Sequence, residues 1–251
     1  MRINKYLASC NVASRRGAEA IIQAGRVTVN GELVTDLAVT VDEHSDIVRL
    51  DGRRLSLQRK KVYVLLNKPK GFITTVKDER GRKSILDIVK VRERIYPVGR
   101  LDRNSEGLLL LTNDGEMTHR LLHPGYKVSK TYRARLDRPF EEKHFETLVT
   151  GVPLDDGVTA PCRARFGPGD GDRIEIQIRE GRKRQVRRMF EALGYDVKTL
   201  KRVQFGPLKL GELRRGEWRL LSRYEVAQLR KAVGLQRKPE TRGQQELTKR
   251  Q

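Results

Sequence analysis

Residues 99–115 read GRLDRNSEGLLLLTNDG and follow the apolar segment Ile95-Tyr96-Pro97-Val98. The apolar run from Leu108 to Leu111 is too short for a globular helix, so the sequence predicts two buried strands joined by a polar loop. Asp102 lies in that loop. A loop held between two buried strands is where a rigid scaffold can present a reactive side chain, although aspartate also starts turns by bonding its own backbone. The residue type and its position leave both roles open.

The charge of the chain predicts a polyanionic partner. Among 251 residues there are 53 Lys and Arg against 32 Asp and Glu, which gives a net charge of +21. Such an excess favours either nucleic acid or an anionic membrane surface. The sequence contains neither an apolar run of the roughly 20 residues that span a bilayer nor the apolar core of a signal peptide. We therefore expect a cytoplasmic protein that binds nucleic acid and no membrane.

Cysteine and histidine usage predicts no metal site. Cys10 and Cys162 lie far apart and have no Cys-x-x-Cys partner, so both are expected to be structural. His119 and His123 share a helical face, but Arg120 stands where a zinc protease has its glutamate, and there is no third ligand nearby.

The first fifty residues predict a compact basic unit. Ile3, Tyr6, Leu7 and Cys10 have helical spacing. Ser14 is expected to cap a second helix, and the Asn-Gly that follows Val29 indicates a two-residue hairpin. One positive surface is expected from the basic side chains of this unit, namely Arg2, Lys5, Arg15, Arg16 and Arg26.

Two groups of motifs resemble one enzyme family. The segment from Gly99 to Asp102, together with EGLLLLTNDG, resembles the catalytic motif of the RsuA/RluB family of ribosomal RNA pseudouridine synthases. The series RINKYLA, SRRGAEAII and AGRVTVNG resembles the S4 RNA-binding domain that precedes the catalytic domain in that family. The resemblance implies that Asp102 is the catalytic residue and that the N-terminal helix pair lies against RNA.

Three further motifs assign roles to single residues through the same resemblance. KTYRA resembles the second family motif, whose tyrosine packs on the target base, so the role falls on Tyr132. EGRKRQVRRM resembles the third, whose arginine pairs with the catalytic aspartate and favours its charged form; this implies Arg187, with Arg188 as the alternative. VKTLKR resembles the last, in which Leu200 lines the base pocket. Without the resemblance, Tyr132 and Leu200 are ordinary strand residues of a core.

Other basic residues in these motifs are expected to meet substrate or phosphate. Arg100 and Lys130 are predicted to bind substrate, and Arg182 and Lys183 to contact RNA phosphates. The turn NKPKG, which resembles the family's opening motif, is assigned phosphate contact at most. Asn113 is expected to cap a helix, with Glu116 in the reciprocal position.

We predict an α+β fold in which a small S4 domain precedes a larger domain with a mainly antiparallel sheet flanked by helices. The expected divisions are an S4-like domain over 1–57, a linker over 58–61, a catalytic domain over 62–235 and a disordered basic tail over 236–251.

The predicted function is isomerisation of uridine to pseudouridine in ribosomal RNA, by a monomer that needs no cofactor. The motif details favour 23S rRNA of the large subunit over 16S rRNA. Two other classes stay open, a ribosome-assembly factor that binds RNA without catalysis and a basic DNA-binding protein, although no DNA-binding motif is recognisable.

Overall fold

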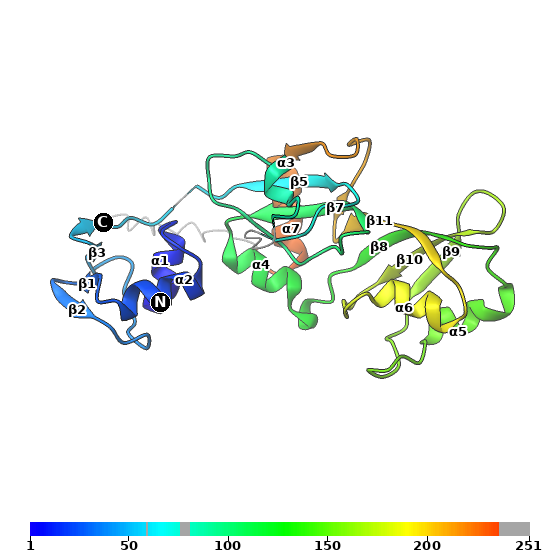
Figure 1. The fold of residues 1–251 in the computed structure, drawn as a ribbon, viewed down its shortest axis with the longest axis horizontal. Coiled ribbons are helices and arrows are strands. Elements are labelled where there is room, and N and C mark those ends of the chain that lie inside the picture. The colour runs from blue at the N-terminus through cyan, green and yellow to red at the C-terminus, as the bar shows by residue number, and fades with distance from the viewer. Residues whose placement is uncertain (59, 76–80, 236–251) are drawn as a thin grey trace, which may run out of the picture. The chain divides into compact units, whose positions relative to one another are not determined.

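The computed structural model describes residues 1–58, 60–75 and 81–235. The chain divides into two compact units, one ending at Lys61 and the other beginning at Val62 (Figure 1). This division falls at the end of the expected linker. The expected tail over 236–251 lies outside the described residues. The two units are described separately below.

The N-terminal unit is a helix pair with a small sheet. Helices α1 (Ile3–Ser9) and α2 (Arg15–Gln23) precede strands β1 (Val27–Val29), β2 (Glu32–Val34), β3 (Val48–Leu50) and β4 (Arg53–Arg54). The strand order is β2-β1-β3-β4, and every pair is antiparallel. Ile3, Leu7 and Ile22 are fully buried between helices and sheet.

Local sequence signals set the boundaries in this unit. The Oγ atom of Ser14 accepts a hydrogen bond from the Gly17 amide at 3.0 Å, which is the expected cap of α2. Asn30 and Gly31 both have positive φ and join β1 to β2, as a tight hairpin turn requires. The predicted cap and hairpin are confirmed.

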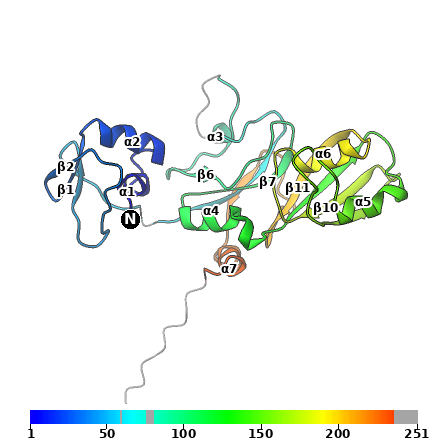
Figure 2. The ribbon, with the colours of Figure 1, turned by 90° about the horizontal axis from the view of Figure 1, so that it is seen from below.

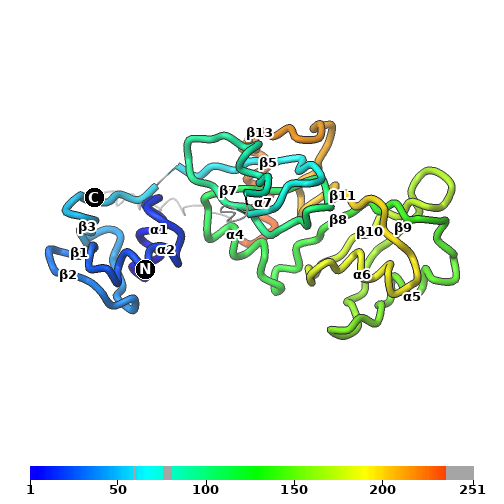
Figure 3. The backbone as a smooth tube through the Cα atoms, in the orientation of Figure 1, coloured from blue at the N-terminus to red at the C-terminus, as the bar shows by residue number. Residues whose placement is uncertain are grey.

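The second unit is built on a sheet of nine strands. Its main path runs β13 (Trp218–Leu220), β5 (Tyr63–Lys68), β7 (Glu106–Thr112), β11 (Val197–Phe205), β8 (Lys130–Leu136), β10 (Arg173–Ile178) and β9 (Arg163–Phe166). Strands β6 (Tyr96–Pro97) and β12 (Leu208–Lys209) pair with β7 and β11. Figure 3 traces β11 through the middle of this arrangement. Among the described strands only β7 and β11 pair in parallel, so the predicted mainly antiparallel α+β fold is confirmed.

Helices cover both faces of this sheet. Helices α4 (Gly115–Leu122) and α7 (Arg223–Ala232) pack on one face of β5 and β7, and α3 (Ile85–Ile88) packs on the other (Figure 2). Helices α5 (Phe145–Thr150) and α6 (Gln185–Ala192) pack against β8, β10 and β11. The apolar run of β7 is fully buried because helices cover it on both sides.

The strands on either side of the Asp102 loop form the predicted hairpin. Tyr96 pairs with Thr112 and Pro97 with Leu111, which places residues 99–105 between the half-buried β6 and the buried β7. The prediction that both strands are buried holds for β7 only. At the other side of β7, Gly107 lies against β11 with φ of 100°. A Cβ at this position would come 2.2 Å from the Arg202 carbonyl oxygen, so the close approach of the two strands requires glycine.

The predicted helix cap at Asn113 is wrong. The cap of α4 is Asp114, whose Oδ1 accepts the Met117 amide at 3.1 Å. Asn113 instead accepts the backbone amide of Val62 through its own Oδ1. Both residue types cap helices well, and the tertiary contact with β5 decides between them.

Candidate active site

A pocket of about 650 Å³ lies in the second unit where five segments meet. The Asp102 loop, the C-terminal end of α4, strands β8 and β11, and the turn over 179–185 all contribute lining residues. The structure brings together in this lining seven of the residues predicted from the sequence: Arg100, Asp102, Lys130, Tyr132, Arg182, Lys183 and Leu200.

Backbone contacts fix the loop that presents Asp102. Leu101 both donates to and accepts from the Thr74 hydroxyl, at 3.2 and 2.7 Å. The Gly71 amide donates to the Arg103 carbonyl at 2.8 Å, and the Ser105 amide to the carbonyl of Asp102 at 3.0 Å. Asp102 itself is exposed and lines the pocket.

Lys68 lies beneath this loop and is fully buried. Its Nζ donates to the carbonyl oxygens of Asp102 at 3.1 Å, Ser105 at 2.9 Å and Pro69 at 3.1 Å. Burial lowers the pKa of Lys68 to about 8, while the charges of Glu106 and Asp102 act in the opposite direction. A buried ammonium cannot reach a phosphate, so the phosphate contact predicted for the NKPKG turn would fall to the exposed Lys70, and Lys68 positions the Asp102 loop.

Arg187 holds the same loop from the other side. It is 8% exposed, and its guanidinium donates to the Asn104 carbonyl at 3.2 Å and to the Val197 carbonyl at 2.6 Å. The side chain therefore reaches the backbone two residues beyond Asp102. No ion pair between Arg187 and Asp102 is formed in the structure, although their charges attract. The alternative, Arg188, pairs with Asp156 instead, at 2.5 Å.

Replacing Arg187 by lysine is expected to slow single-turnover pseudouridine formation about tenfold, because one ammonium cannot serve two carbonyls on opposite sides as a guanidinium does. Arg188→Lys is the matched control, since Arg188 lies on the same helix but contacts Asp156. The measurement is the single-turnover rate with saturating enzyme. If the two variants react alike, Arg187 does not position the loop.

The floor of the pocket is one face of β8 and β11. In the register of these antiparallel strands, Tyr132 lies opposite Arg202, and Leu200 lies opposite Ala134. Directly opposed side chains point to the same face of a sheet. Tyr132 is partly buried and Leu200 is 5% exposed. An aromatic ring and a leucine side by side form a flat apolar surface of the kind on which a nucleobase stacks.

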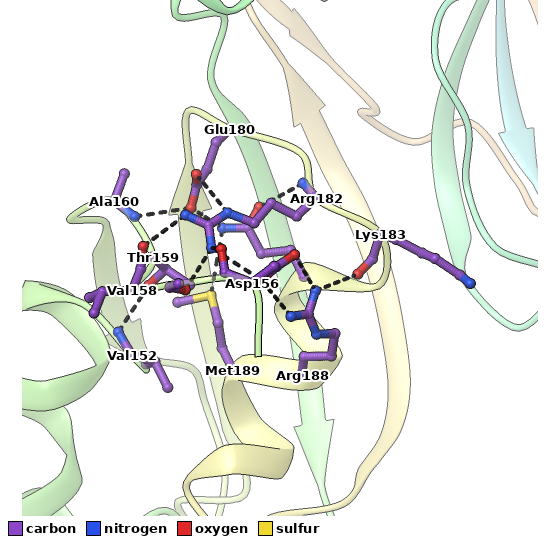
Figure 4. A network of polar contacts seen from close by, with 12 residues as sticks. Val152, Asp156, Val158, Thr159, Ala160, Glu180, Arg182, Lys183, Arg188 and Met189 are labelled. Atoms are coloured by element: carbon purple, nitrogen blue, oxygen red, sulfur yellow. Dashed lines mark hydrogen bonds and ion pairs between the residues drawn. The ribbon is translucent and has the colours of Figure 1, made fainter. Parts of the chain in front are cut away.

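Figure 4 shows that Arg182 belongs to a network within the protein. Its guanidinium donates to the carbonyls of Gly157 and Val158, each at 2.7 Å, and pairs with Asp156 at 3.2 Å. Hydrogen bonds from Arg188 and then Arg182 hold the pKa of the Asp156 carboxyl well below its usual range. These contacts show that Arg182 ties the pocket turn to the loop over 151–160. Its phosphate contact stays a prediction.

Three other cations line the pocket, and two of them are exposed. Lys183 projects away from the network of Figure 4 into solvent, and Arg100 is exposed beside Asp102. Lys130 is half-buried, and its Nζ donates to the Glu180 carbonyl at 3.2 Å. These three residues surround the pocket with positive charge.

The basic residues predicted on the N-terminal unit are exposed. Within that unit Arg26 pairs with Asp51, at 2.5 Å, and half of its side chain stays accessible. The other four predicted residues are also exposed, and none of them forms an ion pair in the described part of the chain: Arg2, Lys5, Arg15 and Arg16. They are available to contact phosphates.

The double variant Arg15→Ala, Arg16→Ala is expected to bind RNA more weakly and with a flatter salt dependence. Each lost phosphate contact removes about 0.7 to 0.9 from the slope of log affinity against log salt. The rate at saturating RNA should stay near that of wild type, because the pocket is untouched. Affinity measured at several salt concentrations tests this, and an unchanged slope means that the two arginines do not contact phosphate.

Within residues 1–58, 60–75 and 81–235 no cluster of three metal-ligating side chains is present. In the same part of the chain, no helix has the length and apolar character needed to cross a bilayer.

Two buried cations of this site were missed by the sequence analysis, Lys68 and Arg202. The available signal for Lys68 was its place in the NKPKG motif, directly after an apolar strand. For Arg202 it was the alternation of β11, which puts the residue on the same face as Leu200.

Comparison with known proteins agrees with this geometry. The family model for RNA pseudouridylate synthase matches residues 62–192, and the S4 domain model matches residues 1–48. An uncharacterized RNA pseudouridine synthase from Aquifex aeolicus (strain VF5) is 47% identical, over 96% of this chain and 98% of its own. The ribosomal large subunit pseudouridine synthase B of Bacillus subtilis (strain 168) is 44% identical, over 91% of this chain and 95% of its own.

A solved structure supports the same assignment. The crystal structure of a pseudouridylate synthase superposes with a TM-score of 0.67 and 31% identity, covering 91% of this chain and 99% of that one. Matches of this identity extend through both units, from the S4 unit to the strands that carry the pocket. The chain therefore belongs to the RNA pseudouridine synthase family, with an N-terminal S4 domain.

Proposed function

We propose that this protein converts uridine to pseudouridine in 23S ribosomal RNA, with Asp102 as the catalytic carboxylate. The observation that carries the proposal is the meeting of an exposed Asp102, Tyr132 and Leu200 in one pocket. The choice of large-subunit RNA is supported by two relatives that are named ribosomal large subunit pseudouridine synthase B. One is the Bacillus subtilis protein, and the other, from Vibrio cholerae serotype O1, is 37% identical over 96% of this chain.

The reaction needs a pocket that retains the base. The bond between N1 of uracil and C1′ of ribose breaks, the uracil turns, and C5 forms the new bond to C1′. The C5 proton then leaves and N1 takes up a proton, so that the product is an isomer of the substrate. No group is donated and no net oxidation occurs, so we expect no cofactor. Asp102 either attacks the sugar or base or stabilises charge as the base detaches.

The other residues receive roles from their positions. The uridine leaves its helix or loop to enter the pocket, where Tyr132 stacks on it and Leu200 supports it from the floor. Lys68 and Arg187 hold the loop of Asp102, and Arg100, Lys130 and Lys183 attract the RNA strand. A proton acceptor for C5 is supplied by Tyr132 or Asp102. We expect a cytoplasmic monomer whose S4 surface positions the RNA.

The test uses unmodified 23S and 16S transcripts labelled with tritium at C5 of uridine, because isomerisation releases that tritium to water. We expect release from the 23S transcript at rates at least tenfold above those from 16S. Preferential release from 16S reassigns the substrate to the small subunit. RNA binding without release from either transcript would instead indicate a ribosome-assembly factor.

A further inference from the structure

Arg202 is a buried cation that the roles above leave without a task. It is 2% exposed, and its Nε donates to the Leu108 carbonyl at 2.8 Å. One of its terminal nitrogens, Nη2, is buried and has no hydrogen-bond partner in the described part of the chain. Leaving a buried charged donor unpaired costs more free energy than leaving a neutral donor unpaired. A fold that keeps such a nitrogen is expected to use it for a ligand.

The position of Arg202 indicates where that ligand binds. The residue lines the pocket, on the same face of the sheet as Tyr132, which is its directly opposed partner. Ser105, three residues after Asp102, also lines the pocket, and its buried hydroxyl oxygen has no hydrogen-bond partner among the described residues. Two unsatisfied polar groups of this kind, in residues that line one pocket, point to a polar ligand that enters it.

Two cations lie at this floor. Lys130 lies next along the same face, opposite Phe205, and the Arg202 guanidinium is 5.2 Å from the centre of that phenyl ring. Burial and then the charge of Arg202 lower the pKa of Lys130. Neither cation forms an ion pair with a carboxylate among the described residues. The floor therefore suits a ligand with electron-rich oxygen atoms.

We propose that Arg202 donates a hydrogen bond from Nη2 to a carbonyl oxygen of the target uracil, and that Arg202 and Lys130 together stabilise the negative charge on the detached base. This inference rests on the proposed function. When the bond from N1 to C1′ breaks, its electron pair stays on the uracil and spreads onto O2 and O4. The pair is used again when C5 bonds to C1′, and Arg202 donates a hydrogen bond throughout without transferring a proton.

A base fits this position better than a backbone phosphate. Arg202 is 2% exposed and lines the pocket, so a ligand of its Nη2 is expected to enter the pocket beside Tyr132. A ring stacked on Tyr132 turns its edge toward the neighbouring side chain, and the edge of uracil carries two carbonyl acceptors. A preorganised donor at developing charge is typically worth about 10²–10³ in rate.

The experiment pairs protein variants with altered bases. Short RNA substrates carry uridine, 2-thiouridine or 4-thiouridine at the modified position, since sulfur is a weak hydrogen-bond acceptor. Wild type, Arg202→Gln and Arg202→Lys are compared, with Lys201→Gln as control because Lys201 is next on β11 and opposes Arg133 rather than Tyr132. Melting temperatures and the salt dependence of RNA binding are recorded for each protein.

We expect Arg202→Gln to slow conversion of the uridine substrate about 10²-fold and Lys201→Gln to slow it less than threefold. One thio substrate should react slowly with wild type yet bring no further loss in Arg202→Gln, which is the mark of a shared contact. If Arg202→Gln does not fold, Arg202→Lys gives the same reading, because one ammonium cannot reach both Leu108 and the base.

Additive losses with both thio substrates would overturn the proposal. A flatter salt dependence in the Arg202 variants would also overturn it and identify a phosphate as the ligand. Failure of the proposed function has a different signature, since wild type then converts none of the uridine substrate.

Discussion

Asp102→Asn is expected to lower the single-turnover rate of pseudouridine formation by on the order of 10⁴-fold or more, the scale seen when a nucleophile is removed. The carboxamide has nearly the size of the carboxylate but no charge. Because Asp102 is exposed and its loop is fixed by backbone contacts, the fold should not change. The melting temperature and the RNA affinity of the variant are therefore expected to match those of wild type.

The control is Asp196→Asn, which removes an exposed carboxylate at the start of β11, away from the pocket lining. Its rate should stay within about twofold of wild type, as for surface substitutions away from a site. Wild-type turnover in Asp102→Asn would mean that the carboxylate of Asp102 takes no part in the chemistry.

Lys68→Met is expected to lower the same rate about 10²-fold, because a displacement of about 1 Å in a catalytic group can cost that much. Methionine fills the space but leaves the carbonyls of Asp102, Ser105 and Pro69 without their donor. Lys70→Met is the matched control, since Lys70 is exposed two residues away. If both variants keep the wild-type rate, Lys68 does not set the position of Asp102.

The same lysine predicts a pH dependence of stability. In the unfolded chain Lys68 titrates near 10.5, and in the folded protein its pKa is about 8. Between these values the unfolded chain binds more protons, so the contribution of Lys68 to the free energy of unfolding rises with pH. Below pH 8 that contribution is constant and unfavourable. The rise is expected to reach about 3 kcal/mol.

Denaturant unfolding at several pH values, compared between wild type and Lys68→Met, measures this difference. The wild type should gain stability relative to the variant as pH rises from about 8 to 10.5, the interval between the two pKa values. Lys70→Met should follow the wild type. A constant difference across the interval would show that Lys68 titrates normally in the folded protein.

The parts of the fold that sequence predicts are those with local causes. The hairpin around Asp102 follows from short apolar runs, the turn at Asn30 and Gly31 from residues that accept positive φ, and the cap of α7 from Ser222 and Glu225. Each signal lies within a few residues of the structure that it sets. The order of the strands was not predicted, because their pairing depends on distant segments; the family resemblance implied only a mainly antiparallel sheet.

The parts of the site that sequence missed depend on distant partners. Arg182 pairs with Asp156, which lies 26 residues earlier in the chain. Lys68 reaches carbonyls more than thirty residues later. Arg187 and Arg188 are neighbours in the chain and carry the same charge. Only packing shows that Arg187 is buried while Arg188 pairs with Asp156 at the surface. A sequence gives the charge of these side chains but not the acceptors that surround them.

The most direct test maps pseudouridine, position by position, in unmodified 23S and 16S transcripts after incubation with wild type or with Asp102→Asn. Both proteins are used at concentrations that saturate RNA binding, so that affinity does not enter. We predict a defined uridine in the 23S transcript that wild type converts and Asp102→Asn leaves unchanged, and no comparable position in the 16S transcript. Equal conversion by the two proteins, or no conversion of the 23S transcript by wild type, would contradict the account.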